Sequence, residues 1–439
     1  MLESILFKGI PYLSTAGLVN QDVLVKNGKI VQIEPSIREH ADCIIKDSGL
    51  ILMPGVIDAH VHFREPGATH KENLYSGPKS AASGGVTTFF EMPNTAPSTT
   101  TAALIQEKKD IAKEKSLINY NFFIGATSEN LNELLTVENV AGIKIYVGSS
   151  TGSLLVDDDP HLREIFSKSN KLVAVHSEDE ATIKANKERY AQSTSIHDHL
   201  NIRSTEAAVK CTKRLLQLAK ETKARLHICH LTSADELDLI NHYALPNVTT
   251  EVSPQHLFLA APDCYDKLGT LAQINPPIRE RHHAEALLQG VVNEQIPMIA
   301  TDHAPHTLAE KQAPFPKAPS GMPGVETALP LLLTMASRNL LKLEDIPRLM
   351  CEGPAHCFSI QSKGRIDVGY DADLVLVDLK KSYTLENSKM LSRAGWTAFD
   401  GWNCTGAVIA TYVNGQLVFR EGEFFEEIKG QEVRVGAQV

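Results

Sequence analysis

Eight short runs of β-branched and aromatic residues alternate along this chain with longer amphipathic segments. Such alternation is typical of βαβ units, in which helices join parallel strands. Eight is the number of strands that a closed (β/α)8 barrel requires. The sequence therefore predicts an α/β fold built around a TIM-like barrel. The predicted strands span residues 52–58, 87–92, 121–124, 142–147, 172–176, 225–230, 248–252 and 297–301.

The two ends of the chain carry a different pattern. Short β-branched runs separated by turn signals occur between residues 5 and 33 and again between residues 373 and 417. Neither set is large enough to bury a sheet face alone, so we expect the two antiparallel sets to form one small β-sandwich. This interpretation gives a composite β-domain from residues 1–51 and 360–439, and a barrel from residues 52–359.

The composition narrows the range of partners. Of 439 residues 43% are hydrophobic, and the formal net charge of -10 argues against a nucleic-acid partner. The seven cysteines include no Cys-x-x-Cys pair, which suits a reducing cytosol. We find no export signal and no apolar run long enough to span a bilayer. We therefore expect a cytoplasmic protein that acts on a small molecule and binds no membrane.

Two histidines at the end of the first predicted strand are placed to bind one ion. Only one residue separates His60 from His62, and side chains at i and i+2 of a strand point to the same side. A strand end followed by the turn Pro66-Gly67 would hold neutral nitrogen ligands beside a loop that can contact substrate. The alternative is two partly buried histidines without a ligand, and this pattern alone leaves it open.

Further polar residues stand at the ends of other predicted strands. Lys144 lies in the fourth, His176 and His230 end the fifth and sixth, and Asp302 follows the eighth. Barrel enzymes place their active sites at this carboxyl-terminal face. Taken singly, each histidine could cap a strand and Asp302 could cap a helix; we interpret His227 as structural. Together with the first histidine pair, however, they predict a metal-dependent active site.

Lys144 stands among apolar residues of its predicted strand, where a lone ammonium is costly to bury. One interpretation is that its stem extends to the barrel rim. The other is that the neutral amine reacts with carbon dioxide to give an anionic carbamate that bridges two metal ions. Four histidines and one aspartate carry a charge of only about -1 against two divalent ions, so a carbamate would improve that balance.

Five sequence segments give the chain a close resemblance to the dihydroorotases of the cyclic amidohydrolase superfamily, over essentially its whole length. They are HVHFREPG (60–67), MPNT (92–95), INPPIR (274–279), TDHAPH (301–306) and GRIDVGYDADL (364–374). The resemblance implies two zinc ions, one held by His60, His62 and Asp302, the other by His176 and His230, and both bridged by a carbamate on Lys144.

The chain departs from part of the family pattern just past the fourth strand. Some members place a bridging aspartate there, whereas this chain has Gly148 and Ser149. That departure favours Lys144 as the bridge. The acidic run at residues 157–159 is interpreted as a solvated turn without a metal role.

The resemblance also implies how substrate is held. In the family, residues at the positions of Arg64, Asn94 and His306 bind the substrate carboxylate, and the one at Asn275 contacts the ring. A guanidinium fork is well suited to a carboxylate. The alternative for Arg64 is a salt bridge with neighbouring Glu65.

The resemblance implies the reversible hydrolysis of the cyclic amide of (S)-dihydroorotate to N-carbamoyl-L-aspartate, a step of de novo pyrimidine biosynthesis, with Asp302 moving the proton. One alternative is a cyclic amidase of the allantoinase or hydantoinase type. Another is a non-catalytic structural partner of aspartate transcarbamoylase. A homodimer and association with aspartate transcarbamoylase are retained as candidate assemblies. Residues 306–324 are expected to form part of the site wall, a lid over the site or a plain surface loop.

Overall fold

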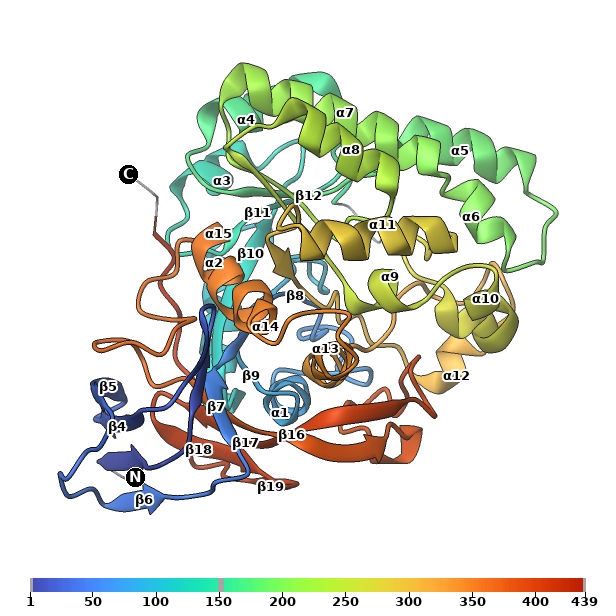
Figure 1. Ribbon diagram of the computed structural model, residues 1–439. Helices are drawn as coiled ribbons and strands as arrows, with labels where there is room; N and C mark the ends of the chain where they lie inside the picture. The colour runs from blue at the N-terminus through green and yellow to red at the C-terminus, as the bar shows by residue number, and fades with distance from the viewer. Residues whose placement is uncertain (1–2, 149–153, 437–439) are drawn as a thin grey trace.

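The computed structural model describes residues 3–148 and 154–436 and contains an eight-stranded parallel sheet that curves into a barrel (Figure 1). The eight predicted strands fall, in order, on the eight observed ones, which confirms the α/β barrel. The barrel strands are β8 (Val56–Val61), β9 (Val86–Glu91), β10 (Asn119–Gly125), β11 (Gly142–Tyr146), β12 (Val173–His176), β13 (Leu226–Ile228), β14 (Val248–Val252) and β15 (Met298–Ile299).

Helices cover the outside of the barrel, and local sequence explains their bounds. The longest is α7 (Thr205–Thr222), which begins where the Ser204 side chain accepts a hydrogen bond from the Ala207 amide and ends at Lys223 in a left-handed conformation. The other α-helices are α1 (Ser76–Ser83), α2 (Ala102–Lys115), α3 (Leu131–Thr136), α4 (Asp159–Lys168), α5 (Glu180–Arg189), α6 (Asp198–Ile202), α8 (Ala234–Tyr243), α9 (Pro254–Phe258), α10 (Asp263–Leu268), α11 (Arg281–Val292), α12 (Leu308–Lys311), α13 (Ala328–Ser337), α14 (Asp345–Pro347) and α15 (Gly353–Cys357). Short 3-10 turns cover Gly269–Ala272 and Asn387–Lys389, and a π-helical turn covers Arg348–Glu352.

The first and last barrel strands are joined mainly by one buried carboxylate. Asp58 of β8 accepts hydrogen bonds from the backbone amide of Thr301, at 3.1 Å, and from its hydroxyl, at 2.6 Å. Above that contact, the His62 amide donates to the carbonyl of His303 at 2.8 Å. The barrel is therefore closed at its carboxyl-terminal end, where β8 and the segment after β15 meet.

The strands β8 to β15 separate two layers of apolar side chains. Inside the barrel lie residues such as Ile57, Phe90 and Ala174, whereas the helices pack on outward residues such as Ile143 and Val175. Alternation along each strand thus assigns one face to the barrel interior.

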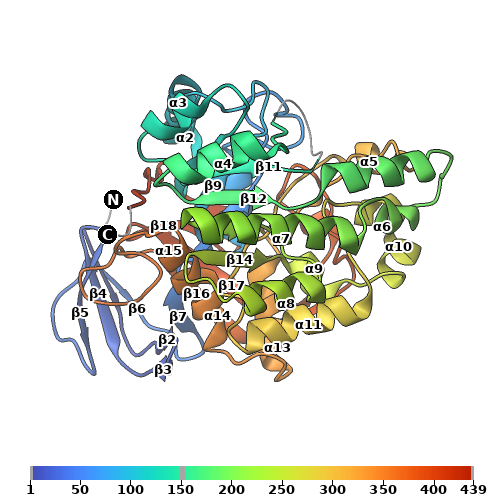
Figure 2. The same ribbon diagram turned by 90° about the horizontal axis from the view of Figure 1, so that it is seen from above.

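Both chain ends contribute to two further sheets, which lie beside the barrel (Figures 1 and 2). The seven-stranded sheet has the order β19-β18-β17-β16-β7-β2-β3, and the four-stranded sheet β5-β4-β1-β6. Their strands are β1 (Ser4–Phe7), β2 (Tyr12–Ser14), β3 (Gly17–Val19), β4 (Asp22–Lys26), β5 (Lys29–Glu34), β6 (Cys43–Ile45), β7 (Ile51–Pro54), β16 (Leu374–Thr384), β17 (Asn403–Val413), β18 (Gln416–Arg420) and β19 (Glu423–Phe424).

One apolar core joins these two sheets. Ile5 and Phe7 of the N-terminal part pack with Leu374, Leu376 and Tyr412 of the C-terminal part. The opposite face of the seven-stranded sheet packs on the barrel, because alternate residues of β16 belong to the barrel's outer core. The predicted sandwich of both chain ends is therefore present and stands against the barrel.

Two details differ from the sequence prediction. The predicted strand 52–58 is two strands, because Ile51–Pro54 pairs with β16 in the seven-stranded sheet and the barrel strand begins only at Val56. The terminal sets are also not purely antiparallel, since β1 pairs in parallel with β6. The division into domains at residues 51/52 and 359/360 stays a prediction. No helix in the two described ranges is both long enough and apolar enough to cross a membrane.

Candidate metal centre

The residues predicted to form the site gather at the carboxyl-terminal end of the barrel. His60 ends β8, Lys144 lies in β11, His176 ends β12, and His230 and Asp302 follow β13 and β15. His230 and Asp302 adopt positive φ angles of 36° and 48°. Left-handed backbone is uncommon for such residues and is concentrated at functional sites, where the surrounding structure holds it in place.

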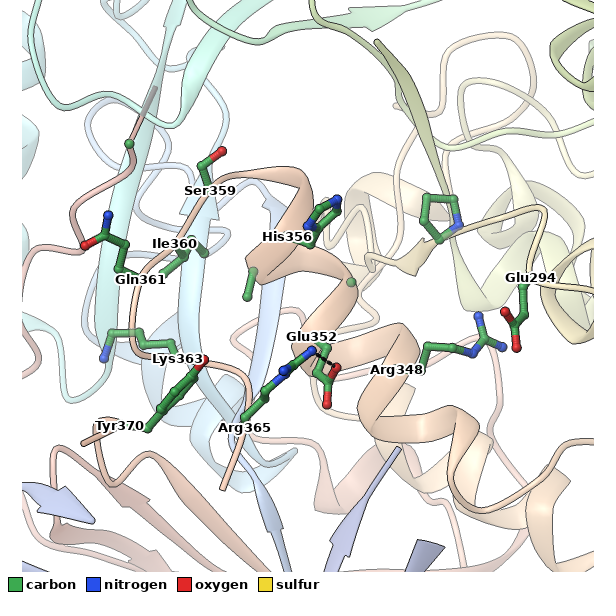
Figure 3. A pocket seen from close by; sticks show the side chains of 14 residues that line it. Glu294, Arg348, Glu352, His356, Ser359, Ile360, Gln361, Lys363, Arg365 and Tyr370 are labelled. Carbon is green, nitrogen blue, oxygen red and sulfur yellow. Dashed lines mark hydrogen bonds and ion pairs between the residues drawn. The ribbon is translucent and has the colours of Figure 1, made fainter. Parts of the chain in front are cut away.

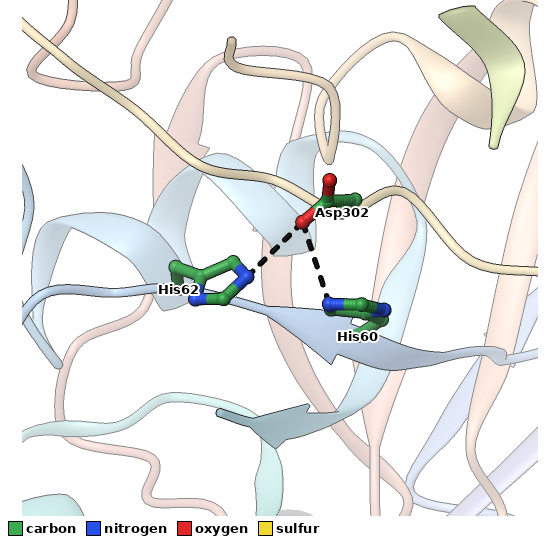
Figure 4. Close-up of side chains that lie close together, drawn as sticks. All are labelled: His60, His62 and Asp302. Atoms are coloured by element: carbon green, nitrogen blue, oxygen red, sulfur yellow. Dashed lines mark hydrogen bonds and ion pairs between the residues drawn. The ribbon is translucent and has the colours of Figure 1, made fainter. Parts of the chain in front are cut away.

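Three of these residues form a compact ligand group (Figure 4). Oδ1 of Asp302 lies 3.0 Å from Nε2 of His62 and 3.4 Å from Nε2 of His60. All three side chains are buried, and their ligand atoms lie within 4.8 Å of one another. Two imidazole nitrogens and a carboxylate oxygen at this spacing fit one divalent ion such as zinc.

A carboxylate behind His60 orients its ring. Nδ1 of His60 donates to Oε1 of Glu251 in β14, so its Nε2 is directed toward Asp302. Nε2 of His227 donates to the other oxygen of Glu251 at 3.2 Å. Although burial opposes it, the interactions of Glu251 with His60 and His227, including their hydrogen bonds, lower its pKa. Such a carboxylate–histidine pair fixes the tautomer and increases the basicity of a metal-binding imidazole.

His176 and His230 form the second group. Nδ1 of His176 lies 3.1 Å from Nε2 of His230, and Nε2 of His176 donates to Glu178 at 2.7 Å. Glu178 in turn forms a buried ion pair with Arg203. Burial raises the pKa of Glu178, but Arg203, His176 and Arg279 together outweigh that effect and lower it to about 2. The ring of His176 is therefore oriented by an ionised carboxylate, with its free nitrogen facing His230.

Lys144 lies between these groups in a fully buried position. Its Nζ donates to Sγ of Cys229 at 3.0 Å and lies 5.1 Å from the ring centre of Tyr146. Within residues 3–148 and 154–436, no carboxylate forms an ion pair with Lys144, and the Tyr146 hydroxyl has no hydrogen-bond partner. A buried lysine without a counter-charge beside two ligand groups fits the role of a bridging carbamate.

Burial dominates the electrostatics of the site. It lowers the pKa of His60, His62, His176 and His230. It raises the pKa of Asp302, against the opposing interactions with His60 and Lys144. Neutral imidazoles are the form that binds metals, so the histidines are held in the state that a metal site requires.

Two of the predicted substrate contacts lie next to the first ligand group. Nε of Arg64 donates to the carbonyl of Pro305 at 3.1 Å, and one terminal nitrogen lies 3.2 Å from Nε2 of His306. Nδ1 of His306 accepts from Lys71 at 3.0 Å, and its Nε2 donates to the Ser320 carbonyl at 3.1 Å. The guanidinium and the imidazole therefore share one corner of the site.

The structure contains no salt bridge between the described residues Arg64 and Glu65, the alternative considered for Arg64 from the sequence. Glu65 forms its ion pair with Lys115 and accepts a hydrogen bond from the Leu74 amide, so it faces away from the guanidinium. Arg64 itself has a φ of 64°. The positive φ at Arg64 turns its side chain away from the course of the preceding strand and toward Pro305.

Asn94 and Asn275 lie at the same barrel end in different settings. Oδ1 of Asn94 accepts from Nδ1 of His62 at 2.6 Å, a ligand-orienting contact that the sequence did not indicate. Oδ1 of Asn275 is buried without a partner among the described residues.

Gly148 is described, but Ser149, the other residue at which the chain departs from the family pattern, lies outside the described ranges. Residues 157–159 are exposed, but instead of a turn they lead into α4, with Asp158 as its cap and Asp159 as its first residue.

Glu251 and Glu178 are functional residues that the sequence analysis missed. Glu251 is the penultimate residue of β14, and Glu178 lies two residues beyond the end of β12, in the runs 248–252 and 173–178. A charged residue in such a run is the signal that could have found them, because it must have a buried partner.

Not every cavity of the described structure belongs to this centre. One, whose lining side chains include Arg348, Glu352 and Arg365, is shown in Figure 3. It has a volume of about 830 Å³ and is also lined by Pro297, which precedes β15, whereas Asp302 follows that strand. Its cations are already paired, Arg348 with Asp345 and Arg365 with Glu352. The candidate metal centre is therefore separate from this cavity.

Comparison with known proteins places the chain in a well-populated group. The model of the amidohydrolase family matches residues 51–418. The chain is 34% identical over 432 residues to a dihydroorotase of Methanosarcina acetivorans, covering 92% of this chain and 91% of that one. It is 38% identical over 389 residues to a dihydroorotase of Halobacterium salinarum, covering 87% and 89%. The solved L-hydantoinase (dihydropyrimidinase) of Arthrobacter aurescens superposes with a TM-score of 0.94 at 30% identity, covering 99% of this chain and 100% of that one.

Proposed function

Because the chain belongs to the amidohydrolase family, a family of metal-dependent hydrolases, we propose that it is a dihydroorotase. It would hydrolyse the cyclic amide of (S)-dihydroorotate to N-carbamoyl-L-aspartate and catalyse the reverse ring closure. The observation that carries this proposal is Arg64 beside the ligand group of His60, His62 and Asp302. The dihydroorotases among its relatives support the same substrate.

The proposed cofactors are two zinc ions. His60, His62 and Asp302 would hold one, His176 and His230 the other, and a carbamate formed on Lys144 would bridge them. When bound, the ions would polarise the ring carbonyl and favour ionisation of the attacking water. The orienting carboxylates Glu251 and Glu178 support this assignment, since each holds the far nitrogen of a ligand ring.

The residues of the chain divide the remaining work. Arg64, Asn94 and His306 bind the substrate carboxylate, and Asn275 contacts the ring through its unpartnered oxygen. This places the scissile amide over the ligand groups. Asp302 accepts the proton of the attacking water and delivers it to the departing ring nitrogen, and in ring closure it begins protonated.

Hydantoin hydrolysis is the second candidate function, because an L-hydantoinase superposes on the whole chain. Hydantoin itself has no carboxylate, so it would leave the charge of Arg64 without a partner. A non-catalytic role beside aspartate transcarbamoylase is disfavoured, since every predicted ligand is present. We also propose that the protein acts in the cytoplasm, forms a homodimer and associates with aspartate transcarbamoylase.

Turnover of metal-replete protein tests these candidates directly. Dihydroorotate, hydantoin and allantoin are offered at equal concentrations, and ring opening is followed by loss of the cyclic amide absorbance. We expect dihydroorotate to be preferred by at least about 100-fold in kcat/KM, the discrimination expected from one buried charged contact. Preference for hydantoin or allantoin would refute the assignment. Sizing the protein with and without aspartate transcarbamoylase tests the assemblies.

A further inference from the structure

The segment that follows Asp302 is fixed to the neighbouring wall of the site. The backbone amide of Gly321 donates to the carbonyl of Gln273 at 2.9 Å. The Gln273 side-chain nitrogen donates in return to the carbonyl of Ala318 at 2.7 Å. These contacts join residues 318–321 to the residue two positions before Asn275. The segment is therefore a wall of the site, and it contains the short helix α12.

Lys311, at the end of α12, is the central connection in that wall. Its side chain is fully buried, and Nζ donates to the carbonyls of Gln273, at 2.8 Å, and Pro319, at 2.9 Å. The Thr270 hydroxyl donates to the Lys311 carbonyl at 2.6 Å. Pro319 directly precedes Ser320, whose carbonyl accepts from His306. One ammonium thus connects the segment of Asn275 to the segment that orients His306.

The charge of Lys311 has no carboxylate partner in the described part of the chain, since both of its hydrogen bonds go to carbonyl oxygens. Burial, with the nearby positive charge of Arg64, lowers the pKa of Lys311 to about 7. A buried cation near a second cation creates a positive potential that a bound anion would relieve. The geometry therefore gives Lys311 both a mechanical and an electrostatic connection to the carboxylate subsite.

We propose that Lys311 is a positioning residue for the substrate carboxylate. It holds the walls of Asn275 and His306 together, and its ammonium adds to the positive field around Arg64. This inference rests on the proposed function. Lys311 touches neither substrate nor metal ligands, so it acts through the residues that do.

The first test compares two Lys→Met variants in the same segment. Lys311→Met removes the buried ammonium, whereas Lys317→Met removes an exposed one six positions further along. We expect Lys311→Met to raise KM for dihydroorotate at least about tenfold, with bound metal unchanged and kcat reduced less than KM rises. Lys317→Met should match the wild type. A KM for Lys311→Met within twofold of the wild-type value would overturn the proposal.

The second test needs no variant and separates charge from hydrogen bonding. A neutral amine still donates two hydrogen bonds, so raising the pH removes the charge of Lys311 while its contacts to both carbonyls persist. The other charged or titratable groups around it are Arg64, His306, His199 and the pair Lys71–Glu310. Burial lowers the pKa of His199 to about 4 and that of His306 further, so neither ring titrates near neutrality.

Wild-type KM for dihydroorotate should therefore rise between pH 6 and pH 8.5, and the rise should be absent in Lys311→Met. A flat wild-type profile would overturn the electrostatic contribution, and an unchanged rise in the variant would assign it to another group. The proposed function and the role of Lys311 can be refuted separately. Wild-type protein that does not open dihydroorotate overturns the proposed function, whereas active protein with unaltered Lys311→Met kinetics overturns only the role of Lys311.

Discussion

Glu251 holds Nδ1 of His60 from 191 residues further along the chain, and its second oxygen accepts from His227. The carboxylate is therefore shared between a metal-site histidine and a histidine that supports the barrel. Glu251→Gln keeps the shape of the side chain but removes the negative charge. We expect metal affinity to fall about 10- to 100-fold, measured by competition with a chelator. Glu236→Gln is the control, because Glu236 is equally buried but bonded only to Ser233 and Thr212. Equal affinity in the two variants would contradict this role.

Lys144→Ala should lose both metal and activity, because the proposed carbamate supplies the negative charge that bridges the two ligand groups. Short carboxylic acids added to the variant should restore part of the turnover by occupying the vacated space. Zinc content and rate are measured together. A variant that retains two zinc ions and the full rate would show that Lys144 is not the bridge.

Arg64→Met should lose about 2 to 5 kcal/mol of transition-state stabilisation for dihydroorotate, seen as a lower kcat/KM, because a charged contact to the substrate carboxylate is removed. Metal content should not change, since Arg64 contacts Pro305 and His306 rather than a ligand. Arg281→Met, which removes an exposed guanidinium, is the control. Intact dihydroorotate kinetics, or loss of zinc, would show that the role given to Arg64 is wrong.

Asp302→Asn separates metal binding from proton transfer. The amide oxygen can still bind an ion, but the group can no longer accept or deliver a proton. We expect a rate lower by about 100-fold or more with at least partial retention of metal, the effect usual for loss of a general acid or base. Zinc content and the pH–rate profiles of hydrolysis and ring closure test this prediction. Near-normal turnover with metal bound would assign the proton to another group, His306 being the nearest candidate.

Stability should depend on pH through Glu326, which lies outside the metal centre. Burial raises its pKa to about 7, although the amides of Leu391 and Ser392 and the hydroxyl of Ser80 donate to it. The folded state thus binds the proton more tightly than the unfolded chain. The resulting stabilisation is complete below about pH 4.5 and is lost as the pH rises through 7, with an upper limit of about 3 kcal/mol.

Glu326→Gln should therefore be more stable relative to the wild type at pH 8 than at pH 5. Denaturant midpoints of both proteins at the two pH values measure this difference. The exposed carboxylate of Glu107 serves as the control, because its replacement by glutamine removes no buried charge. The same difference for both variants would contradict the role of Glu326.

The barrel and the proposed metal ligands were accessible from sequence because both depend on short-range patterns. Apolar runs alternate with amphipathic segments, and each ligand stands at or just beyond a strand end, except Lys144 within β11. The switch from the terminal sheet to the barrel at Gly55 was not accessible, because residues 51–57 form one apolar run. The reason is tertiary: a Cβ atom on Gly55 would lie 2.2 Å from the Thr87 hydroxyl, so the chain crosses there without a side chain.

The contacts that orient the ligands were also not accessible. Glu251 and Asn94 reach His60 and His62 from other strands or loops, and nothing in the local sequence of either histidine names its partner. The role of Lys311 was not accessible either. In the sequence it resembles any lysine of a helix, and only the structure shows that it is buried against two carbonyls. Candidate metal ligands are therefore easier to predict from sequence than the residues that orient them.

The separation of His62 and Asp302 by 240 residues has a consequence for how the protein is made. Both lie where the closing contact between Asp58 and Thr301 joins the first barrel strand to the last. While the ribosome is still producing β9 to β14, the emerging polypeptide has two of the three ligands of this group and no closed barrel around them. A complete first ligand group therefore marks a barrel that has been translated through its final strand, and prematurely terminated chains would not contain it.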